Sequence, residues 1–403
     1  MEELRGARRL LTMARGAVLG MLIAIGGCGR FGFEAREHGD AATGDGAVDS
    51  AEIPGVFRIA TGDDHACAIL AGALSCWGAN SAGQLGLEML TPSELTPRLV
   101  DGTRRWRDVT GGVAHTCAID EAREVWCWGD NAEGQLGAGD TTPRISRQLV
   151  TLPRPALKIE SMANHTCAIL DDATLYCWGS NAESQLGQGG TPGPPMPSPV
   201  QVTMAWEDVA CGQGHTLGLS GGALHGTGRN TLSELGLGTG ASGQPRTMTP
   251  SPIIQTWRSI TAGQNMSFGI ATDDTLWGWG GNGAGALGLG DTMKRDLPTP
   301  IDTGMTWREV DTDTFHTCAV SNGAALWCWG RNVEGQLGIG DTVTRPTPVN
   351  TSAFADWSAV AVARFFTCGL RGDAVWCTGD NLNGCLGTGD EVRRDAWTPV
   401  VFP

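Results

Sequence analysis

The chain has 403 residues, of which 60 are Gly and 20 are Pro, and it carries a formal charge of −15 at pH 7. Glycine and proline at this frequency favour short strands joined by tight turns over long helices. The negative charge repels phosphate backbones at long range and no basic run offsets it, so we expect no nucleic-acid partner.

The first 27 residues have the layout of a secretory signal peptide. Residues 1–16 contain four arginines, and residues 17–27 (AVLGMLIAIGG) are apolar. That apolar run is shorter than the roughly 20 residues that a helix needs to span a bilayer. The sequence Ile-Gly-Gly before Cys28 resembles the lipobox of bacterial lipoproteins, which implies acylation of Cys28 and a mature N-terminus there. An ordinary signal peptide with an incidental cysteine is the alternative.

Residues 28–50 form the next segment and read as a lipidated, flexible tether. The segment is rich in Gly, Ala and Asp and has almost nothing to bury. Its aspartates Asp40, Asp45 and Asp49 do not follow the twelve-residue ligand pattern of a calcium loop, so a solvated linker is the favoured interpretation.

From residue 51 to residue 403 the chain repeats itself seven times with a period of 50 or 51 residues. The same repeat position is occupied by Cys67, Cys117, Cys167, Leu217, Phe268, Cys318 and Cys368. Each repeat then carries an Asn that precedes a Leu-Gly pair by five residues, at Asn80, Asn131, Asn181, Asn230, Asn282, Asn332 and Asn381. A constant period of this size indicates one domain built from supersecondary units.

The sixth repeat shows the unit most clearly. Short apolar runs bounded by Gly, Asn, Asp and Pro predict four strands, at Trp307–Val310, Thr317–Val320, Leu326–Trp329 and Thr347–Val349. Pro348 marks the last of them as an edge strand. Seven units of four short antiparallel strands predict an all-β fold, a seven-bladed β-propeller, because radial closure shelters many short sheets.

Ten cysteines form five pairs, each within one repeat. The pairs are Cys67/Cys76, Cys117/Cys127, Cys167/Cys177, Cys318/Cys328 and Cys368/Cys377. Repeats four and five lack both members together, which favours bonded pairs across a hairpin. Zinc is the competing hypothesis, but no C-x-x-C spacing supports it. Disulfides imply an oxidising compartment, in agreement with the signal peptide. Cys211 and Cys385 occupy unrelated positions and are expected to be free and partly buried.

The motifs H-T-C-A, L-W-C-W-G-x-N, G-Q-L-G-x-G-D and P-x-P-V recur in this order and closely resemble the regulator of chromosome condensation repeat family. The resemblance covers residues 54–403 and implies a seven-bladed propeller. The family's Trp-Gly pair begins at Trp77, Trp128, Trp178, Trp279 and Trp329, whereas Thr227 and Thr378 replace the tryptophan in repeats four and seven.

Two other recurrent side chains are expected to have structural roles. One set comprises Trp106, Trp206, Trp257, Trp307 and Trp357. These residues favour packing between blades over a ligand-binding aromatic ring. The other set comprises His65, His115, His165, His215 and His316. Equivalent positions on separate blades are too far apart to share one metal ion, so we expect repeated hydrogen bonds from imidazole to backbone.

The leading hypothesis for function is a non-enzymatic propeller that binds proteins. The chain contains no zincin, nucleophile-elbow or phosphate-loop motif, and no cofactor or metal is expected. What differs between repeats is the segment after each Leu-Gly pair, so the candidate binding loops are Glu88–Arg98, Gln188–Pro199 and Thr239–Pro250. The hairpin turns on the opposite side, such as Asp120–Glu124, are the alternative.

Two further hypotheses come from other functional classes. The family's founding member exchanges guanine nucleotides on a small GTPase, but the nearly constant repeat length leaves no insertion for the projecting wedge that this activity uses. The other hypothesis is a lyase or hydrolase with an axial site, because propellers host such enzymes. The expected location is the cell envelope, at the outer membrane or cell surface since Gly29 rather than Asp follows Cys28. A monomer with unidentified envelope proteins as partners is expected.

Overall fold

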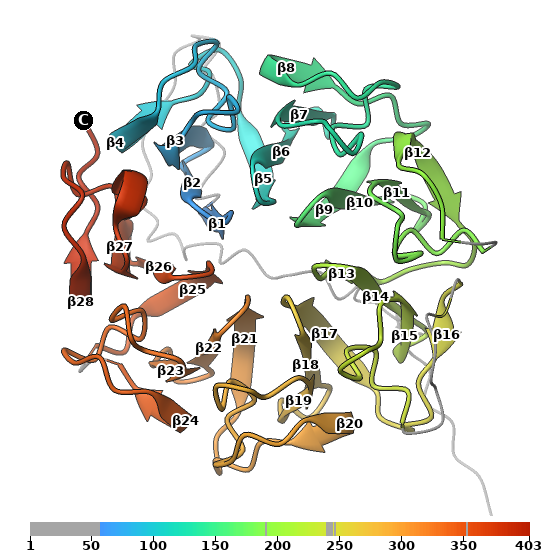
Figure 1. The fold of residues 1–403 in the computed structure, drawn as a ribbon, viewed down its shortest axis with the longest axis vertical. Helices are drawn as coiled ribbons and strands as arrows, with labels where there is room; N and C mark the ends of the chain where they lie inside the picture. The colour runs from blue at the N-terminus through green and yellow to red at the C-terminus, as the bar shows by residue number, and fades with distance from the viewer. Residues whose placement is uncertain (1–56, 190–191, 239–244, 246, 352–353) are drawn as a thin grey trace, which may run out of the picture.

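The computed structural model describes residues 57–189, 192–238, 245, 247–351 and 354–403. Seven four-stranded antiparallel sheets stand in a ring around a central axis (Figure 1). The predicted seven-bladed propeller is therefore confirmed. Apart from one 3-10 turn, η1 (Leu382–Gly384), the regular structure of the described residues is β, and none of their helices is long and apolar enough to cross a membrane.

Each blade takes four strands in chain order, from the axis outward. The strands of blades one to three are β1 (Arg58–Thr61), β2 (His65–Leu70), β3 (Ala73–Ala79), β4 (Ser93–Leu99), β5 (Trp106–Gly111), β6 (His115–Asp120), β7 (Val125–Gly129), β8 (Arg144–Leu149), β9 (Ala156–Met162), β10 (His165–Leu170), β11 (Leu175–Gly179) and β12 (Met196–Val202). Those of blades four and five are β13 (Asp208–Cys211), β14 (His215–Ser220), β15 (Ala223–Gly228), β16 (Thr249–Pro250), β17 (Trp257–Ala262), β18 (Met266–Ala271), β19 (Leu276–Gly280) and β20 (Arg295–Pro300). Those of blades six and seven are β21 (Trp307–Thr312), β22 (His316–Ser321), β23 (Leu326–Gly330), β24 (Arg345–Asn350), β25 (Trp357–Val362), β26 (Phe366–Arg371), β27 (Ala374–Gly379) and β28 (Arg394–Pro399).

Tryptophans fill the spaces between neighbouring blades. The Nε1–H of Trp128 donates to the carbonyl of Gln84 in the preceding blade at 2.8 Å, and the indole is fully buried. Trp77, Trp178, Trp279 and Trp329 make the equivalent bond. In the two repeats without this tryptophan, the hydroxyl of Thr227 donates to Ser184 O at 3.0 Å and that of Thr378 to Gly335 O at 2.9 Å. The threonines keep a hydrogen bond to the same loop, one residue earlier in it, and give up the aromatic packing. The second set of tryptophans is also buried, as expected.

The five cysteine pairs are bonded within their own blades, between the second and third strands. The disulfides join Cys67 to Cys76, Cys117 to Cys127, Cys167 to Cys177, Cys318 to Cys328 and Cys368 to Cys377. The two members of each pair are directly opposed in the strand register, with a Cα–Cα distance of 4.1 Å in every case. These are the pairings expected from the sequence. Cys211 and Cys385 are free, but both are buried rather than partly buried.

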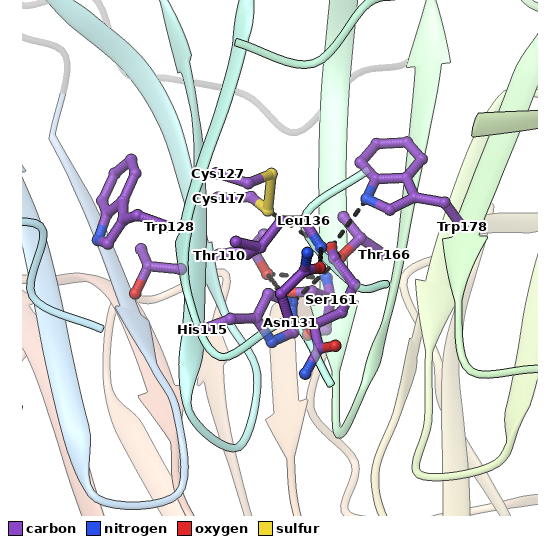
Figure 2. Close-up of a disulfide and its surroundings, with 12 residues drawn as sticks. Thr110, His115, Cys117, Cys127, Trp128, Asn131, Leu136, Ser161, Thr166 and Trp178 are labelled. Carbon is purple, nitrogen blue, oxygen red and sulfur yellow. Dashed lines mark hydrogen bonds between the residues drawn. A yellow bond between two sulfur atoms is a disulfide. The ribbon is translucent and has the colours of Figure 1, made fainter. Parts of the chain in front are cut away.

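Packing explains why blades four and five lack both cysteines. Figure 2 shows where the disulfide lies in blade two, with Cys117 and Cys127 facing blade three. At the same register of blades four and five, Leu217 faces Gly226 and Phe268 faces Gly278. A Cβ on Gly278 would lie 2.9 Å from the Phe268 ring. Either a disulfide or a large side chain opposite glycine therefore fills this place.

The outer strand of each blade contacts the Asn-containing loop of the preceding blade. A Cβ on Gly134 of blade two would lie 2.5 Å from the Cα of Pro197 in β12. A Cβ on Gly384 of blade seven would similarly lie 2.5 Å from Leu95 in β4. Because Leu95 belongs to blade one, this contact closes the ring between the two ends of the repeat array.

Candidate binding face

The propeller has two chemically different faces. One face, here called the turn face, carries the turns between first and second strands together with the loops after third strands. Backbone hydrogen bonds join these two segments: the N–H of Arg331 donates to Phe315 O at 2.9 Å, and that of Asp380 to Phe365 O at 3.0 Å. The other face, the hairpin face, carries the turns between second and third strands and the connections between blades.

The recurrent histidines lie beneath the turn face and link the blades. Each shares a hydrogen bond with a hydroxyl of the next blade, as in His65 Nε2 to Thr116 Oγ1 at 2.9 Å and His316 Nε2 to Thr367 Oγ1 at 2.6 Å. The same contact is made by His115, His165 and His215. The partner of Nε2 is thus a side chain and not the expected backbone group, because the second residue of the next blade's second strand carries a hydroxyl that reaches the imidazole.

Burial keeps these five histidines neutral. It lowers the pKa of each imidazole to about 3 or 4, far below its ordinary value of 6.5. At neutral pH the histidines are therefore uncharged and link neighbouring blades through their hydrogen bonds.

Blades six and seven place an aromatic and arginine cluster on the turn face. Phe315 and Phe365 are stacked, with ring centroids 5.8 Å apart and planes inclined by 25°. The guanidinium of Arg331 lies over both rings, 5.0 Å and 5.8 Å from their centroids, and Arg364 lies 5.0 Å from that of Phe365. Both rings are partly exposed. We call these four residues the Phe–Arg cluster. It was not predicted, although the two phenylalanines stand where the other repeats have small or polar residues.

A salt bridge holds the Phe–Arg cluster in place. Arg331 donates to both carboxylate oxygens of Glu334, at 2.6 Å and 3.1 Å. A guanidinium already bonded on one edge keeps its flat face on the phenylalanine rings, which preorganises the cluster. The following loop residues Val333 and Leu382 are 53% and 64% exposed, so apolar surface adjoins the cluster in both blades.

Carboxylates gather near the cluster where the inner turns meet the axis. Burial, followed by the nearby charge of Asp64, raises the pKa of Asp63 to about 6. Burial, followed by the charge of Asp63, raises the pKa of Asp313 to about 8. Arg364 opposes both shifts. Asp313 also accepts a hydrogen bond from Thr314 at 2.7 Å, so its role in the resting structure is to hold its own turn.

The candidate loops prove to be partly strands. Ser93–Arg98 lies in β4, Met196–Pro199 in β12 and Thr249–Pro250 in β16, which corrects the expectation that the three segments are loops throughout. Proline suits these outer strands because their solvent edge needs no donor. In the first segment, Met89 and Leu90 remain 50% and 61% exposed.

Parts of the other two candidate loops, residues 190–191, 239–244 and 246, lie outside the described residues, as do Cys28 and the expected tether. Where they are described, the loops of blades three and four meet, since Gln188 and Thr247 form an isolated antiparallel bridge.

The alternative hairpin site is a shallow hollow of about 330 Å³ lined by Arg104, Arg105, Asp120, Glu121 and Ala122. Its polar groups are already paired within the protein: Arg104 Nη1 donates to Asp120 Oδ2 at 3.0 Å, and Trp126 Nε1 donates to the same oxygen at 3.1 Å. The Arg104 guanidinium also lies 3.9 Å from the Trp126 ring centroid, so this hairpin site carries one arginine–aromatic pair, whereas the turn face carries two stacked phenylalanines with two arginines.

Comparison with known proteins gives a consistent family match. The family model of the Regulator of chromosome condensation (RCC1) repeat matches five segments, which together make up more than half of the chain: residues 71–119, 124–169, 172–219, 273–320 and 324–370. A second model of the same repeat matches residues 106–135.

Individual relatives are similar over part of their length. Ultraviolet-B receptor UVR8 of Arabidopsis thaliana is 29% identical over 259 residues, which is 61% of this chain and 58% of the receptor. The X-linked retinitis pigmentosa GTPase regulator of Canis lupus familiaris is 38% identical over 234 residues, which is 55% of this chain and 23% of the regulator. The crystal structure of Kap60 bound to yeast RCC1 (Prp20) contains a chain with a TM-score of 0.72 at 19% identity, covering 91% of both chains, and this likeness concerns the fold alone.

Proposed function

The chain belongs to the Regulator of chromosome condensation (RCC1) repeat family, and we propose that it is a non-enzymatic propeller that binds another protein through its turn face. The observation that supports this most directly is the Phe–Arg cluster. Aromatic residues and arginine dominate the binding energy of many protein interfaces, especially where they are central and preorganised. The stacked pair Phe315 and Phe365 loses little conformational freedom on contact, because its rings are already fixed by each other and by Arg331.

The direction of β1 agrees with this choice of face. β1 runs from the hairpin face toward the turn at Asp63, so the chain enters the propeller on the hairpin face. We propose that residues 1–27 are an export signal, that residues 28–50 are a tether lipidated at Cys28, and that residues 51–403 form the propeller at the cell envelope. A lipid anchor joined on the hairpin side would leave the turn face available to partners.

Two other functions receive weaker support. The raised pKa values of Asp63 and Asp313 are a property of many catalytic carboxylates and favour an axial lyase or hydrolase. However, Asp313 is buried and bonded by Thr314, so a substrate would first have to open that turn. Family membership and the similarity to a GTPase regulator support nucleotide exchange on a small GTPase. The constant repeat period argues against the projecting wedge that this activity uses.

A pull-down from envelope extracts tests the main proposal. The full chain and a Phe315→Ser/Phe365→Ser variant are compared as baits, and retained proteins are quantified by mass spectrometry. Loss of a hot spot that contributes about 2 kcal/mol of binding free energy should raise the Kd of a specific partner roughly 30-fold.

The matched control for this experiment is Phe354→Ser. Phe354 is 45% exposed and also carries a stacked arginine, with Arg371 at 3.4 Å from its centroid, but it lies between blades on the hairpin face. A partner lost with the control variant and retained with the turn-face variant would place recognition on the hairpin face. Stimulated nucleotide release from a purified small GTPase would instead favour the exchange function.

A further inference from the structure

The interface between blades three and four brings a third sulfur atom beside a disulfide. Cys211 lies on β13, the innermost strand of blade four, and Cys167 lies on β10 of blade three. The Sγ atoms of Cys167 and Cys211 and a ring nitrogen of His165 all lie within 4.8 Å of one another. All three residues are buried, and Cys211 is not in a disulfide.

Strand geometry explains why these groups meet. His165 and Cys167 are two residues apart on β10, so both side chains point to the same side of the sheet. That side faces blade four, because His165 Nε2 contacts the hydroxyl of Thr216 at 2.9 Å. Cys211 is directly opposite Thr216 in the register of β13 and β14, so its thiol projects toward blade three. Cys177 is directly opposite Cys167 and bonded to it, so breaking the disulfide frees a third thiol next to the three grouped residues.

We propose that reduction of the Cys167–Cys177 disulfide turns this interface into a zinc site with His165, Cys167, Cys177 and Cys211 as ligands. Because the intact disulfide is typical of an oxidising compartment, this step needs a dithiol that is supplied to the protein. The dithiol gives two electrons and two protons, which opens the disulfide to two thiols and oxidises the dithiol to its own disulfide. Binding of Zn²⁺ then displaces the protons of three thiols. One imidazole and three thiolates form a common tetrahedral set for structural zinc.

The dimensions require modest movements of the ligand atoms. With Zn–S bonds of about 2.3 Å and Zn–N bonds of about 2.0 Å, tetrahedral ligand atoms lie roughly 3.5 to 3.8 Å apart. The three grouped atoms, now within 4.8 Å, therefore need to approach by about 1.3 Å at most, and the sulfurs of Cys167 and Cys177 move apart once their bond is broken. His165 Nε2 can bind the metal only when its hydrogen bond with Thr216 opens.

The backbone of blade three holds the Cys211 thiol in place while the disulfide is intact. The thiol now donates to the Glu160 carbonyl at 3.4 Å.

The other disulfide-bearing interfaces supply natural controls. In four other interfaces the preceding blade also carries a disulfide. The residue equivalent to Cys211 in these interfaces is Thr61, Gly111, Ser161 or Val362. Figure 2 shows such an interface, in which His115, the Cys117–Cys127 disulfide and Thr166 are arranged in the same way but Ser161 stands in place of the third cysteine. Among these described interfaces the extra sulfur distinguishes the one between blades three and four.

The experiment uses a full-chain Cys177→Ser variant, purified in mild detergent with the other four disulfides intact. In this variant the Cys167 thiol is free beside His165 and Cys211 without any reductant. Titration with Co²⁺ should give a thiolate-to-cobalt charge-transfer band and tetrahedral d–d bands at one ion per chain, which Zn²⁺ then abolishes. Adding Cys211→Ser should weaken binding by more than about 100-fold, because a direct ligand matters at least as much as its supporting shell.

The matched control is Cys127→Ser, which frees Cys117 beside His115 but has Ser161 nearby, and it should show no such band. Adding Ser161→Cys to that control should create the band. Near-UV circular dichroism identifies folded samples, and wild-type protein reduced with dithiothreitol and desalted provides the four-ligand test if Cys177→Ser does not fold. Equal cobalt binding with and without Cys211, or a Cys167–Cys211 disulfide that blocks binding in Cys177→Ser, would overturn the proposal.

Discussion

The blade disulfides should stabilise the propeller by an amount that one double substitution can isolate. Replacing Cys117→Leu and Cys127→Gly gives blade two the pair that blade four uses at the same register, Leu217 opposite Gly226. Both cysteines are fully buried, and the leucine is expected to fill the space that the sulfurs leave. The double variant therefore removes the covalent link while largely keeping the packing.

The expected loss follows from the sequence separation of 10 residues between Cys117 and Cys127. The chain-entropy relation for a loop of about ten residues gives roughly 2.7 kcal/mol at 25 °C. For a domain of roughly 350 residues with an unfolding entropy of about 2.1 cal/mol/K per residue, this free energy lowers the melting temperature by about 4 °C.

Guanidinium unfolding followed by circular dichroism, with and without reductant, measures the effect. Without reductant the variant should lose roughly 2.7 kcal/mol relative to the wild type. With reductant the difference should vanish, since both proteins then lack the link. Equal stability without reductant, or peptide maps that join Cys117 to a residue of another repeat, would refute the strand pairing and the stabilisation together.

Four further outcomes are expected. Cys28→Ser should release the protein from membranes or leave its precursor unprocessed; unchanged fractionation and migration would contradict the anchor. Because burial lowers the pKa of His115 to about 3 from 6.5, the unfolded chain binds a proton first, and stability should fall as pH drops from about 6.5 toward 3. His115→Gln should flatten that slope in denaturation series measured at several pH values. Asp313 should change stability with pH in the opposite direction, because burial raises its pKa to about 8. Its contribution to the free energy of unfolding is fully present below pH 3.8 and is lost as the pH rises through 8. Asp313→Asn should therefore stabilise the protein most above pH 8. Trp128→Ala should cost about 3 to 5 kcal/mol, and Trp128→Thr about 1 kcal/mol less if its hydroxyl donates to the carbonyl of Gly83, the equivalent of Ser184 that accepts from Thr227; equal unfolding midpoints for the two variants would show that the hydrogen bond does not matter.

Features that are local to one repeat could be predicted from the amino-acid sequence. The period of the marker residues indicated seven blades, and alternation within a hairpin placed Cys117 opposite Cys127, because the two lie on strands joined by a short turn. The four strands of the sixth repeat were predicted within two residues at every end for the same reason: turn residues and apolar runs act over a few positions.

Contacts between blades could be seen only once the blades were arranged in space. His65 reaches Thr116, 51 residues away, and Phe315 stacks on Phe365, the equivalent residue of the next repeat. Such contacts depend on which side of each sheet faces its neighbour, and the period of the sequence is the same for either choice. The convergence of His165, Cys167 and Cys211 was hidden for this reason, since Cys211 sits at a different repeat position from the paired cysteines. Radial packing of the blades, which joins residues one period apart, is what brings them together.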